Sequence, residues 1–328
     1  MFDKFFTPLE KISKAVANGD SMTSTVSPGR EDFLTGLTSL RVLKEILAAQ
    51  SLRLKKRLGQ NFLVDRNILN KILESAGLKS DDLVIEIGAG LGTLTQVIAP
   101  RVEKVWAIEI DRGLVKGLKE RLGSFSNAEV IHGDALKIEF SGLIRRDFGR
   151  INSDLIKRIK IIGNIPYSLT SPLVRKILEE EPDFRRIWLL LPEDVAGRMK
   201  ASPGTKTYGA FSVLVNFYAE VRVIRKIPPQ AFFPIPKVAS RLVKLERHKE
   251  AKFKPGDKNL FFEVVRASFE KRRKKLSNAI KPVLEKRGLD FSEIQKGCQI
   301  DLNRRGETLS LDEFVELADC IAKHIFAE

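Results

Sequence analysis

The chain has 328 residues, of which 43% are hydrophobic, and 57 Lys and Arg against 42 Asp and Glu give it a formal net charge of +15. This indicates a globular protein with room for a full α/β domain and a smaller second domain, and the positive charge indicates a polyanionic partner. No apolar run is long enough to span a bilayer, and the few His and Cys are not spaced as metal ligands. Two cysteines cannot form a disulfide framework, which is typical of a reducing compartment.

The first part of the chain divides into three segments. Residues 1–35 contain no motif and are predicted to be a poorly ordered N-terminal extension. Apolar positions between Gly36 and Gln50 recur at helical spacing and predict a helix. A basic run that includes Lys55, Lys56 and Arg57 follows. Such a run is usually a solvated surface, and contact with nucleic-acid phosphates is the alternative.

Three successive strands are predicted to end in residues that suit a nucleoside cofactor. Leu83–Ile87 is a strand candidate, and Gly88 and Gly90 follow it at the turn into a helix, where glycines let the backbone approach a ligand. The next strand ends in Glu109, where a carboxylate can bind ribose hydroxyls, and a third is followed by Asp134. The spacing G-x-G-x-G is closer to an S-adenosylmethionine loop than to the G-x-G-x-x-G of dinucleotide dehydrogenases.

A fourth strand, Ile159–Ile162, leads through a glycine into Asn164, Ile165, Pro166 and Tyr167. The exocyclic amine of adenine is a poor nucleophile, and an Asn carbonyl together with a backbone carbonyl can accept its two N–H groups. Because Asn is neutral, its role there is to polarise and position the amine. Tyr167 offers a flat face on which a flipped base can stack. The alternative for this tetrapeptide alone is an ordinary strand-ending turn with a core tyrosine.

The remaining sequence completes the α/β domain and then changes character. Further strands are predicted at 187–191, 221–224 and 240–246, and a helix at 210–218. The stretch 250–257 is polar, with Lys, Pro and Gly, and marks a domain boundary. The catalytic α/β domain is therefore expected at 36–250 and a small all-α domain at 251–328. Helices of the second domain are predicted at 260–269, 272–287, 290–297 and 311–326.

Ordered motifs along most of the chain resemble the ribosomal RNA adenine N6,N6-dimethyltransferases, the small-subunit enzymes whose bacterial members confer kasugamycin sensitivity. The resemblance runs from about Leu40 to about Ile325. Its motifs are K-R-L-G-Q-N-F-L, E-I-G-A-G-L-G, I-E-I-D, G-D-A-L, G-N-I-P-Y, Y-G-A-F-S-V, F-F-P-I-P-K-V, S-F-E-K-R-R-K-K and R-G-E-T-L-S.

The resemblance implies a Rossmann-like S-adenosylmethionine methyltransferase sheet with a small C-terminal all-α RNA-binding domain. It implies dimethylation of N6 of two adjacent adenosines in the 3′-terminal hairpin loop of small-subunit (16S) rRNA, during assembly of the 30S subunit. The implied protein is a cytoplasmic monomer that uses no metal and no membrane.

The resemblance also implies roles for particular residues. The implied cofactor-binding residues are Asn61, Leu63, Gly88, Gly90, Glu109, Asp134 and Asn164. The implied catalytic residues are Asn164, Ile165, Pro166, Tyr167 and Phe232, where Phe232 is equally well explained as a core anchor. The residues expected to face RNA phosphates are Lys55, Lys56, Arg57, Arg272, Arg273, Lys274 and Lys275, with a solvated surface as the alternative.

Three other functions fit these residues less well. The erythromycin-resistance methyltransferases, which act on large-subunit rRNA, share N-I-P-Y, but the C-terminal motifs of this chain disfavour them. A non-catalytic binding protein, as in mitochondrial transcription factors of this fold, is disfavoured because Gly88, Glu109, Asp134 and Asn164 are intact. A dehydrogenase would need a catalytic His or Lys that the motifs do not supply.

Overall fold

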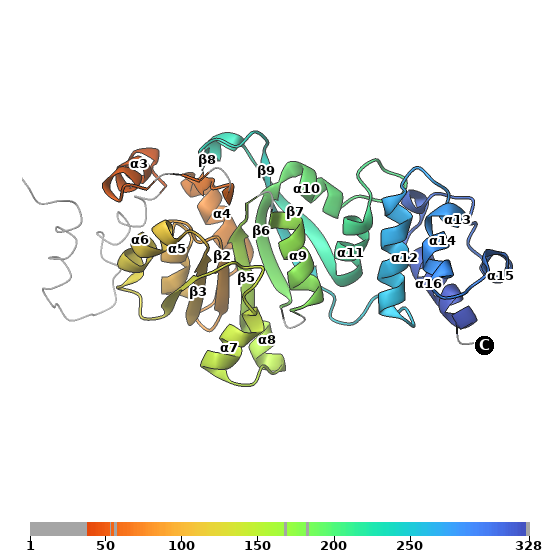
Figure 1. The fold of residues 1–328 in the computed structure, drawn as a ribbon. Helices are drawn as coiled ribbons and strands as arrows, with labels where there is room; N and C mark the ends of the chain where they lie inside the picture. The colour runs from red at the N-terminus through yellow and green to blue at the C-terminus, as the bar shows by residue number, and fades with distance from the viewer. Residues whose placement is uncertain (1–37, 53, 56–57, 167–168, 182–183, 326–328) are drawn as a thin grey trace, which may run out of the picture. The chain divides into compact units, whose positions relative to one another are not determined.

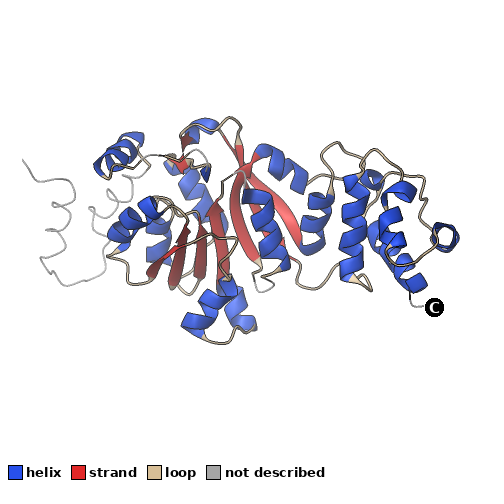
Figure 2. Ribbon diagram, viewed as in Figure 1, coloured by secondary structure: helices blue, strands red, loops and turns tan. Residues whose placement is uncertain are grey.

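A twisted mixed sheet of seven strands is the centre of the computed structural model, which describes residues 38–325 except 53, 56–57, 167–168 and 182–183. Figure 1 shows the order of the elements, and Figure 2 shows the helices packed against the sheet. The predicted N-terminal extension, residues 1–35, lies outside the described residues.

The sheet has the strand order β4-β3-β2-β5-β6-β9-β7. Its strands are β2 (Leu83–Ile87), β3 (Lys104–Glu109), β4 (Ala128–His132), β5 (Ile159–Asn164), β6 (Arg186–Pro192), β7 (Ala219–Ile227) and β9 (Ser240–Arg247). The first five are parallel, and β9 pairs antiparallel with both β6 and β7. A separate antiparallel pair, β1 (Phe62–Leu63) with β8 (Phe232–Phe233), was not predicted from the sequence.

The central strands are apolar on both faces because helices cover them. Every residue of β2 is buried, and β6 is buried from Ile187 to Pro192. Such continuous Val, Ile and Leu runs are typical of parallel strands in α/β proteins. The predicted α/β fold class is therefore confirmed, with a doubly wound order that reverses between β2 and β5.

The helices of the α/β part connect these strands. They are α3 (Leu40–Ala49), α4 (Arg66–Ala76), α5 (Thr95–Ile98), η2 (Ala99–Arg101), α6 (Arg112–Leu122), α7 (Phe140–Phe148), α8 (Ser153–Arg158), α9 (Thr170–Glu179), α10 (Glu193–Met199), α11 (Ala210–Tyr218) and η4 (Pro229–Ala231). Helix α4 begins where Asp65 accepts hydrogen bonds from the amides of Asn67 and Ile68. It ends at Gly77, which has a left-handed backbone with φ +52°.

The chain after β9 is helical, as predicted. It contains α12 (Lys258–Glu270), α13 (Leu276–Ala279), α14 (Lys281–Glu285), α15 (Phe291–Gly297), η5 (Gly306–Thr308) and α16 (Leu311–Ile325). Helix α16 starts with a reciprocal capping box, in which the Ser310 amide donates to the Glu313 carboxylate and the Glu313 amide to the Ser310 hydroxyl. Figure 1 shows α12 beside α11, so the helical part continues from the edge of the sheet that carries β7.

The single helix predicted at 272–287 is wrong. Residues 271–275 are not helical, and two short helices, α13 and α14, follow. Pro282 explains the break between α13 and α14, because it has no amide hydrogen and its ring clashes with the preceding turn inside a helix. It stands in the first turn of α14, where a proline is tolerated.

Cys298 and Cys320 form a disulfide with their Cα atoms 5.7 Å apart, a link that was not predicted from the sequence. It joins the end of α15 to α16 and runs against the expectation, drawn from the two cysteines, of a reducing compartment. Among the described residues, no helix is long and apolar enough to cross a membrane. No cluster of His, Cys, Asp or Glu in that part of the chain could hold a metal ion.

Candidate active site

One cavity lies at the carboxyl ends of β2, β3, β4 and β5, beside the point where the strand order reverses. Open α/β sheets bind their ligands at this position. Ten of the predicted site residues line the cavity, namely Asn61, Leu63, Gly88, Gly90, Glu109, Asp134, Asn164, Ile165, Pro166 and Phe232. Tyr167 lies outside the described residues.

The turn after β2 forms one wall of the cavity and requires glycine. Gly88 and Gly90 have φ values of +76° and +58°. A Cβ atom on Gly88 would lie 2.8 Å from the carbonyl oxygen of Asn164, on the neighbouring strand β5. The turn and the end of β5 are therefore in backbone contact, and any larger residue at 88 would push Asn164 away.

Glu109, at the end of β3, is held by the backbone on both sides. One carboxylate oxygen accepts from the Gly90 amide and the other from the Asp111 amide, both at 2.8 Å. Burial raises the pKa of Glu109, while these hydrogen bonds partly offset the effect. The carboxylate is only 6% exposed and keeps further lone pairs toward the cavity.

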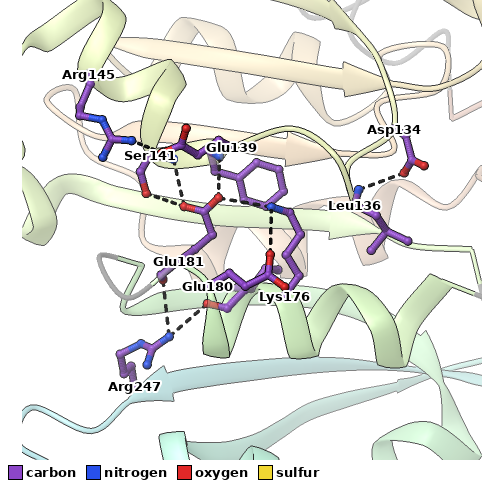
Figure 3. Close-up of polar contacts among 11 residues, drawn as sticks. Asp134, Leu136, Glu139, Ser141, Arg145, Lys176, Glu180, Glu181 and Arg247 are labelled. Carbon is purple, nitrogen blue, oxygen red and sulfur yellow. Dashed lines mark hydrogen bonds and ion pairs between the residues drawn. The ribbon is translucent and has the colours of Figure 1, made fainter.

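Asp134 belongs to a loop that is fixed at two points. Its carboxylate accepts from the Leu136 amide at 2.9 Å. The loop leads into α7, whose first amides, those of Phe140 and Ser141, donate to the buried carboxylate of Glu181 at 2.7 and 3.1 Å. Figure 3 shows Glu181 at the centre of this group with Lys176 beside it, and shows Asp134 joined to Leu136 apart from the group. A carboxylate at a helix N-terminus is stabilising, so Glu181 stabilises the start of α7 and thereby the end of the loop that carries Asp134.

Asn164 and Asn61 are joined although they are 103 residues apart. The Nδ2 atom of Asn164 donates to the backbone carbonyl of Asn61 at 2.8 Å. This contact turns the Asn164 amide so that its Oδ1 atom remains available as an acceptor. Asn61 immediately precedes β1, and β1 pairs with β8 through Leu63 and Phe232. Phe232 is only 3% exposed and lines the cavity, so its side chain serves both the core and the cavity wall.

Glu86 is a cavity residue to which the sequence motifs assigned no role. It is 1% exposed, lines the cavity, and its Oε2 atom has no hydrogen-bond partner among the described residues. Burial, together with the nearby charge of Glu109, raises its pKa to about 8, although the neighbouring Thr95 hydroxyl acts in the other direction. The one feature of the sequence that could have identified Glu86 as a cavity residue is its position two residues before the glycine turn. A strand with four apolar residues and one glutamate does not show whether that carboxyl is buried or lacks a partner.

The predicted RNA-facing residues behave differently from one another. Lys55 forms an ion pair with the buried carboxylate of Asp111 at 2.6 Å, so its charge is partly neutralised. Arg272 forms an ion pair with Glu307, so its charge is also partly neutralised. Arg273 and Lys274 are exposed and have no ion pair within the described part of the chain. Lys56 and Arg57 lie outside the described residues.

The strand order, the glycine turn and the acidic residues at successive strand ends define an S-adenosylmethionine-dependent methyltransferase of the Rossmann-like class. A match of residues 51–323 to the family model described as "Ribosomal RNA adenine dimethylase" gives the family. The chain belongs to the ribosomal RNA adenine dimethylase family, which confirms the resemblance seen in the sequence.

Curated relatives and solved structures agree with this assignment. The "Ribosomal RNA small subunit methyltransferase A" of Clostridium botulinum (strain Loch Maree / Type A3) is 42% identical over 85% of this chain and 98% of that protein. The protein of the same name from Alkaliphilus oremlandii (strain OhILAs) is 41% identical over 88% of this chain and 99% of that protein. A dimethyladenosine transferase from Plasmodium falciparum is 26% identical, with a TM-score of 0.62 over 77% of this chain and 94% of that chain.

A 23S rRNA methyltransferase, ErmE, has the same fold. It is 24% identical, with a TM-score of 0.57 over 80% of this chain and 99% of that chain. At this identity the likeness concerns the fold alone. The large-subunit alternative therefore gains nothing from it, whereas the curated relatives above carry small-subunit names.

Proposed function

We propose that this protein transfers methyl groups from S-adenosylmethionine to N6 of two adjacent adenosines in the 3′-terminal hairpin loop of small-subunit rRNA. The names of the curated relatives and the family match support this target. The formal net charge of +15 suits an RNA substrate. We place the reaction in the cytoplasm, on a precursor of the small subunit, with the protein acting as a monomer.

The cavity residues fit the proposed cofactor. The unpartnered Oε2 of Glu86 belongs to a buried carboxyl that can ionise beside a cationic ligand, and the glycines at 88 and 90, with their positive φ angles, keep this turn free of side chains. Glu109 would bind the ribose hydroxyls, and Asp134 would accept from the adenine amino group. Leu63 and the Asn61 segment would cover the methionine end. When bound, the cofactor supplies an electrophilic methyl group on a sulfonium centre.

The Asn164 amide is the observation that supports the chemistry most directly. Because its Nδ2 is fixed on the Asn61 carbonyl, its Oδ1 is held at the end of β5 as an acceptor for one N–H of the adenine amine. The Ile165 carbonyl would accept the other, since Pro166 supplies no competing amide hydrogen. Two such acceptors favour a tetrahedral nitrogen whose lone pair can attack the methyl carbon.

Proton release follows from the neutrality of asparagine. The new N–C bond at N6 forms as the methyl–sulfur bond breaks, and the nitrogen then carries a positive charge. Asn164 cannot take the proton, so the proton leaves to water after its N–H has been held by the amide oxygen. A second cycle requires the monomethylated amine to rotate so that its remaining N–H faces Oδ1. Phe232 and Tyr167 would hold the flipped base between flat side chains.

Asn164→Ala tests this function. We expect methylation of small-subunit rRNA to be abolished because the amine acceptor is removed. Cofactor affinity should stay within a few-fold, since Gly88, Glu109 and Asp134 remain although the hydrogen bond to the Asn61 carbonyl is lost. Primer extension across the 3′-terminal hairpin, in a strain lacking the gene and complemented with each variant, reports the dimethylated positions as stops. Asn67→Ala, an exposed asparagine on α4, is the matched control and should behave as wild type. Wild-type stops in the Asn164→Ala strain would contradict the mechanism.

A further inference from the structure

The loop between β8 and β9 exposes apolar side chains beside the cavity. Ile235 is 64% exposed and Val238 is 42% exposed, among the highest values for large apolar residues in the described part of the chain. Lys237 lies between them, is also exposed, and has no ion pair within the described residues. Exposed isoleucine is unremarkable when isolated, but here two apolar residues and a cation form one tip.

This loop is held firmly, so the exposure of Ile235 does not result from a loose segment. Phe233, on one side, packs into the apolar cluster around Leu43 and Phe62, and Lys44 lies 5.4 Å from the centre of its ring. On the other side Pro236 is buried, and the carbonyl of Ala239 accepts from the Glu193 amide at 2.9 Å. Two prolines flank Ile235 and fix the backbone φ angles next to it. The tip is a rigid, apolar projection.

The position of the loop relates it to the active site. Phe232, just before the loop, and Ser240, just after it, both line the cavity. Ile235 therefore stands at the rim, within the short span of chain that connects two parts of the cavity wall. A polymer with one residue in the cavity can therefore bring a neighbouring residue against Ile235.

We propose that Ile235 inserts into the base stack of the RNA next to the target adenosine and occupies the position that the target base leaves. This inference rests on the proposed function, because it requires an RNA with one base turned into the cavity. Val238 extends the apolar surface under the neighbouring base, and Lys237 contacts the adjoining phosphate.

Physical chemistry favours this occupant over other polymers. Removing a base from its stack costs a few kcal/mol, and apolar side chains inserted between bases recover part of that cost in several nucleic-acid-binding proteins. The apolar face of the neighbouring base is covered again when the isoleucine replaces the departed base. A protein partner would instead require a broad apolar patch, whereas a narrow apolar tip with an adjacent lysine matches the alternation of bases and phosphates.

Base extrusion can be measured directly by fluorescence. A hairpin RNA with the target-loop sequence carries 2-aminopurine at the position next to the target adenosine, where loss of stacking changes its emission. We expect the wild-type protein with S-adenosylhomocysteine to change the emission at saturation. Ile235→Ala should lose most of this change, while Ile235→Leu should retain it because it conserves apolar bulk. Ile224→Ala removes another exposed isoleucine, on β7, and should match wild type.

Kinetics on unmethylated small subunits provide the second measurement. Ile235→Ala should lower kcat/KM by about ten- to hundredfold, the range expected when one large aliphatic side chain is no longer buried. Cofactor affinity and thermal stability should match wild type, since Ile235 is exposed in the free protein. Ile235→Leu and Ile224→Ala should each stay within about threefold of wild type by the same measure.

Each remaining outcome has a defined meaning. Wild-type emission and kcat/KM in Ile235→Ala would overturn the inference. Weaker RNA binding with an unchanged emission at saturation would also overturn it, because Ile235 would then be a surface contact that leaves the stack intact. If the wild-type protein methylates no adenosine of small-subunit rRNA, the proposed function fails, and the emission arm still decides whether Ile235 enters an RNA stack.

Discussion

The two ends of strand β2 each bury a carboxyl group, and the two groups have opposite surroundings. At the amino end, Asp82 is 2% exposed, and its carboxylate accepts from the ammonium of Lys160 and from the Lys79 amide. Lys160, which is 1% exposed, also donates to the Gly77 carbonyl at 2.8 Å. At the carboxyl end, Glu86 is equally buried, and one of its oxygens has no partner among the described residues.

The contrast separates a structural group from a binding group. Burying an unpaired charge is costly, so a buried acid is normally paired, as Asp82 is. Glu86 has no such partner and is kept protonated by its raised pKa, on the wall of a cavity where a cationic ligand can complete its interactions. The hydrogen bonds of Asp82 are thus completed within the folded protein, whereas those of Glu86 can be completed only by a bound ligand.

Removing the buried ion pair between Asp82 and Lys160 should have the largest effect on stability. Asp82→Ala leaves Lys160 buried without its counter-charge and should lower the free energy of unfolding by about 3–5 kcal/mol. Urea denaturation measures this. Asp81→Ala is the control, because Asp81 is adjacent and 61% exposed in its side chain, and it should change stability by less than about 0.5 kcal/mol. Equal stabilities for the two variants would mean that the pairing of Asp82 with Lys160 does not stabilise the fold.

The buried carboxyl of Glu86 should make the stability of the protein depend on pH. The pKa of Glu86 is raised from 4.5 to about 8 in the folded protein. Between these values the folded protein keeps a proton that the unfolded chain has released, so its stability falls as pH rises through this window. Glu86→Gln should remove that slope, and the difference between the two proteins should amount to a few kcal/mol across the window.

The same variant should change cofactor binding with the opposite pH trend. An ionised Glu86 attracts a cation, so wild-type affinity for S-adenosylmethionine should increase toward pH 8, and Glu86→Gln should show a flatter dependence. Calorimetry over pH 5–9 measures both proteins. Parallel curves of stability and of affinity for the two proteins would mean that Glu86 has no role beyond packing.

Glu109 is intermediate between Asp82 and Glu86, since two backbone amides donate hydrogen bonds to its carboxylate and other lone pairs stay open. Glu109→Ala should weaken S-adenosylmethionine binding by about 1.5–3 kcal/mol, the range for hydrogen bonds to a charged group. It also removes the acceptor of the Gly90 and Asp111 amides, so affinity is measured on a variant that thermal unfolding shows to be folded. Unchanged affinity in such a sample would remove Glu109 from the cofactor site.

The smallest effect concerns the surface cations, to which the same contrast extends. Arg272 is paired with Glu307 and Lys275 donates to Asn303, whereas Arg273 and Lys274 have no such partner among the described residues. Replacing Arg273 and Lys274 by Ala should flatten the salt dependence of small-subunit binding by roughly 0.7–0.9 in slope for each phosphate that is no longer neutralised.

Two exposed lysines on α6 provide the control for this change. Lys116 and Lys119 have no ion pair in the described part of the chain, and replacing both by Ala removes the same charge. Equal salt slopes for the two double variants would return the C-terminal cluster to a solvated surface. Cofactor affinity should not change in either.

Much of the architecture was predictable because local signals and packing agree. Asp65 and Ser310 cap the starts of α4 and α16, and Gly77 ends α4, as these residue types favour. These boundaries depend on hydrogen bonds within a few residues. The helix expected across 272–287 failed because its apolar spacing continued past Pro282, whose missing amide outweighs the pattern.

The sequence predicted which residues form the site but not the contacts between them. Sequence order places Gly88, Glu109, Asp134 and Asn164 at strand ends, and strand ends of a parallel sheet converge. The pairing of β1 with β8, the contact of Asn164 with Asn61 and the partnerless carboxyl of Glu86 depend on residues distant in sequence. No local pattern carries that information.

The short pair of β1 and β8 has a consequence for how the protein folds. It joins Phe62–Leu63 to Phe232–Phe233 and so closes a very long chain loop, within which all five parallel strands lie. Contacts of such high sequence separation form late and at a large entropic cost, because most of the chain must already be ordered. We therefore expect the cavity wall that includes Leu63 and Phe232 to be among the last parts of the site to form. Full cofactor affinity should then appear only after β8 has paired with β1, so that ligand binding would report on late folding.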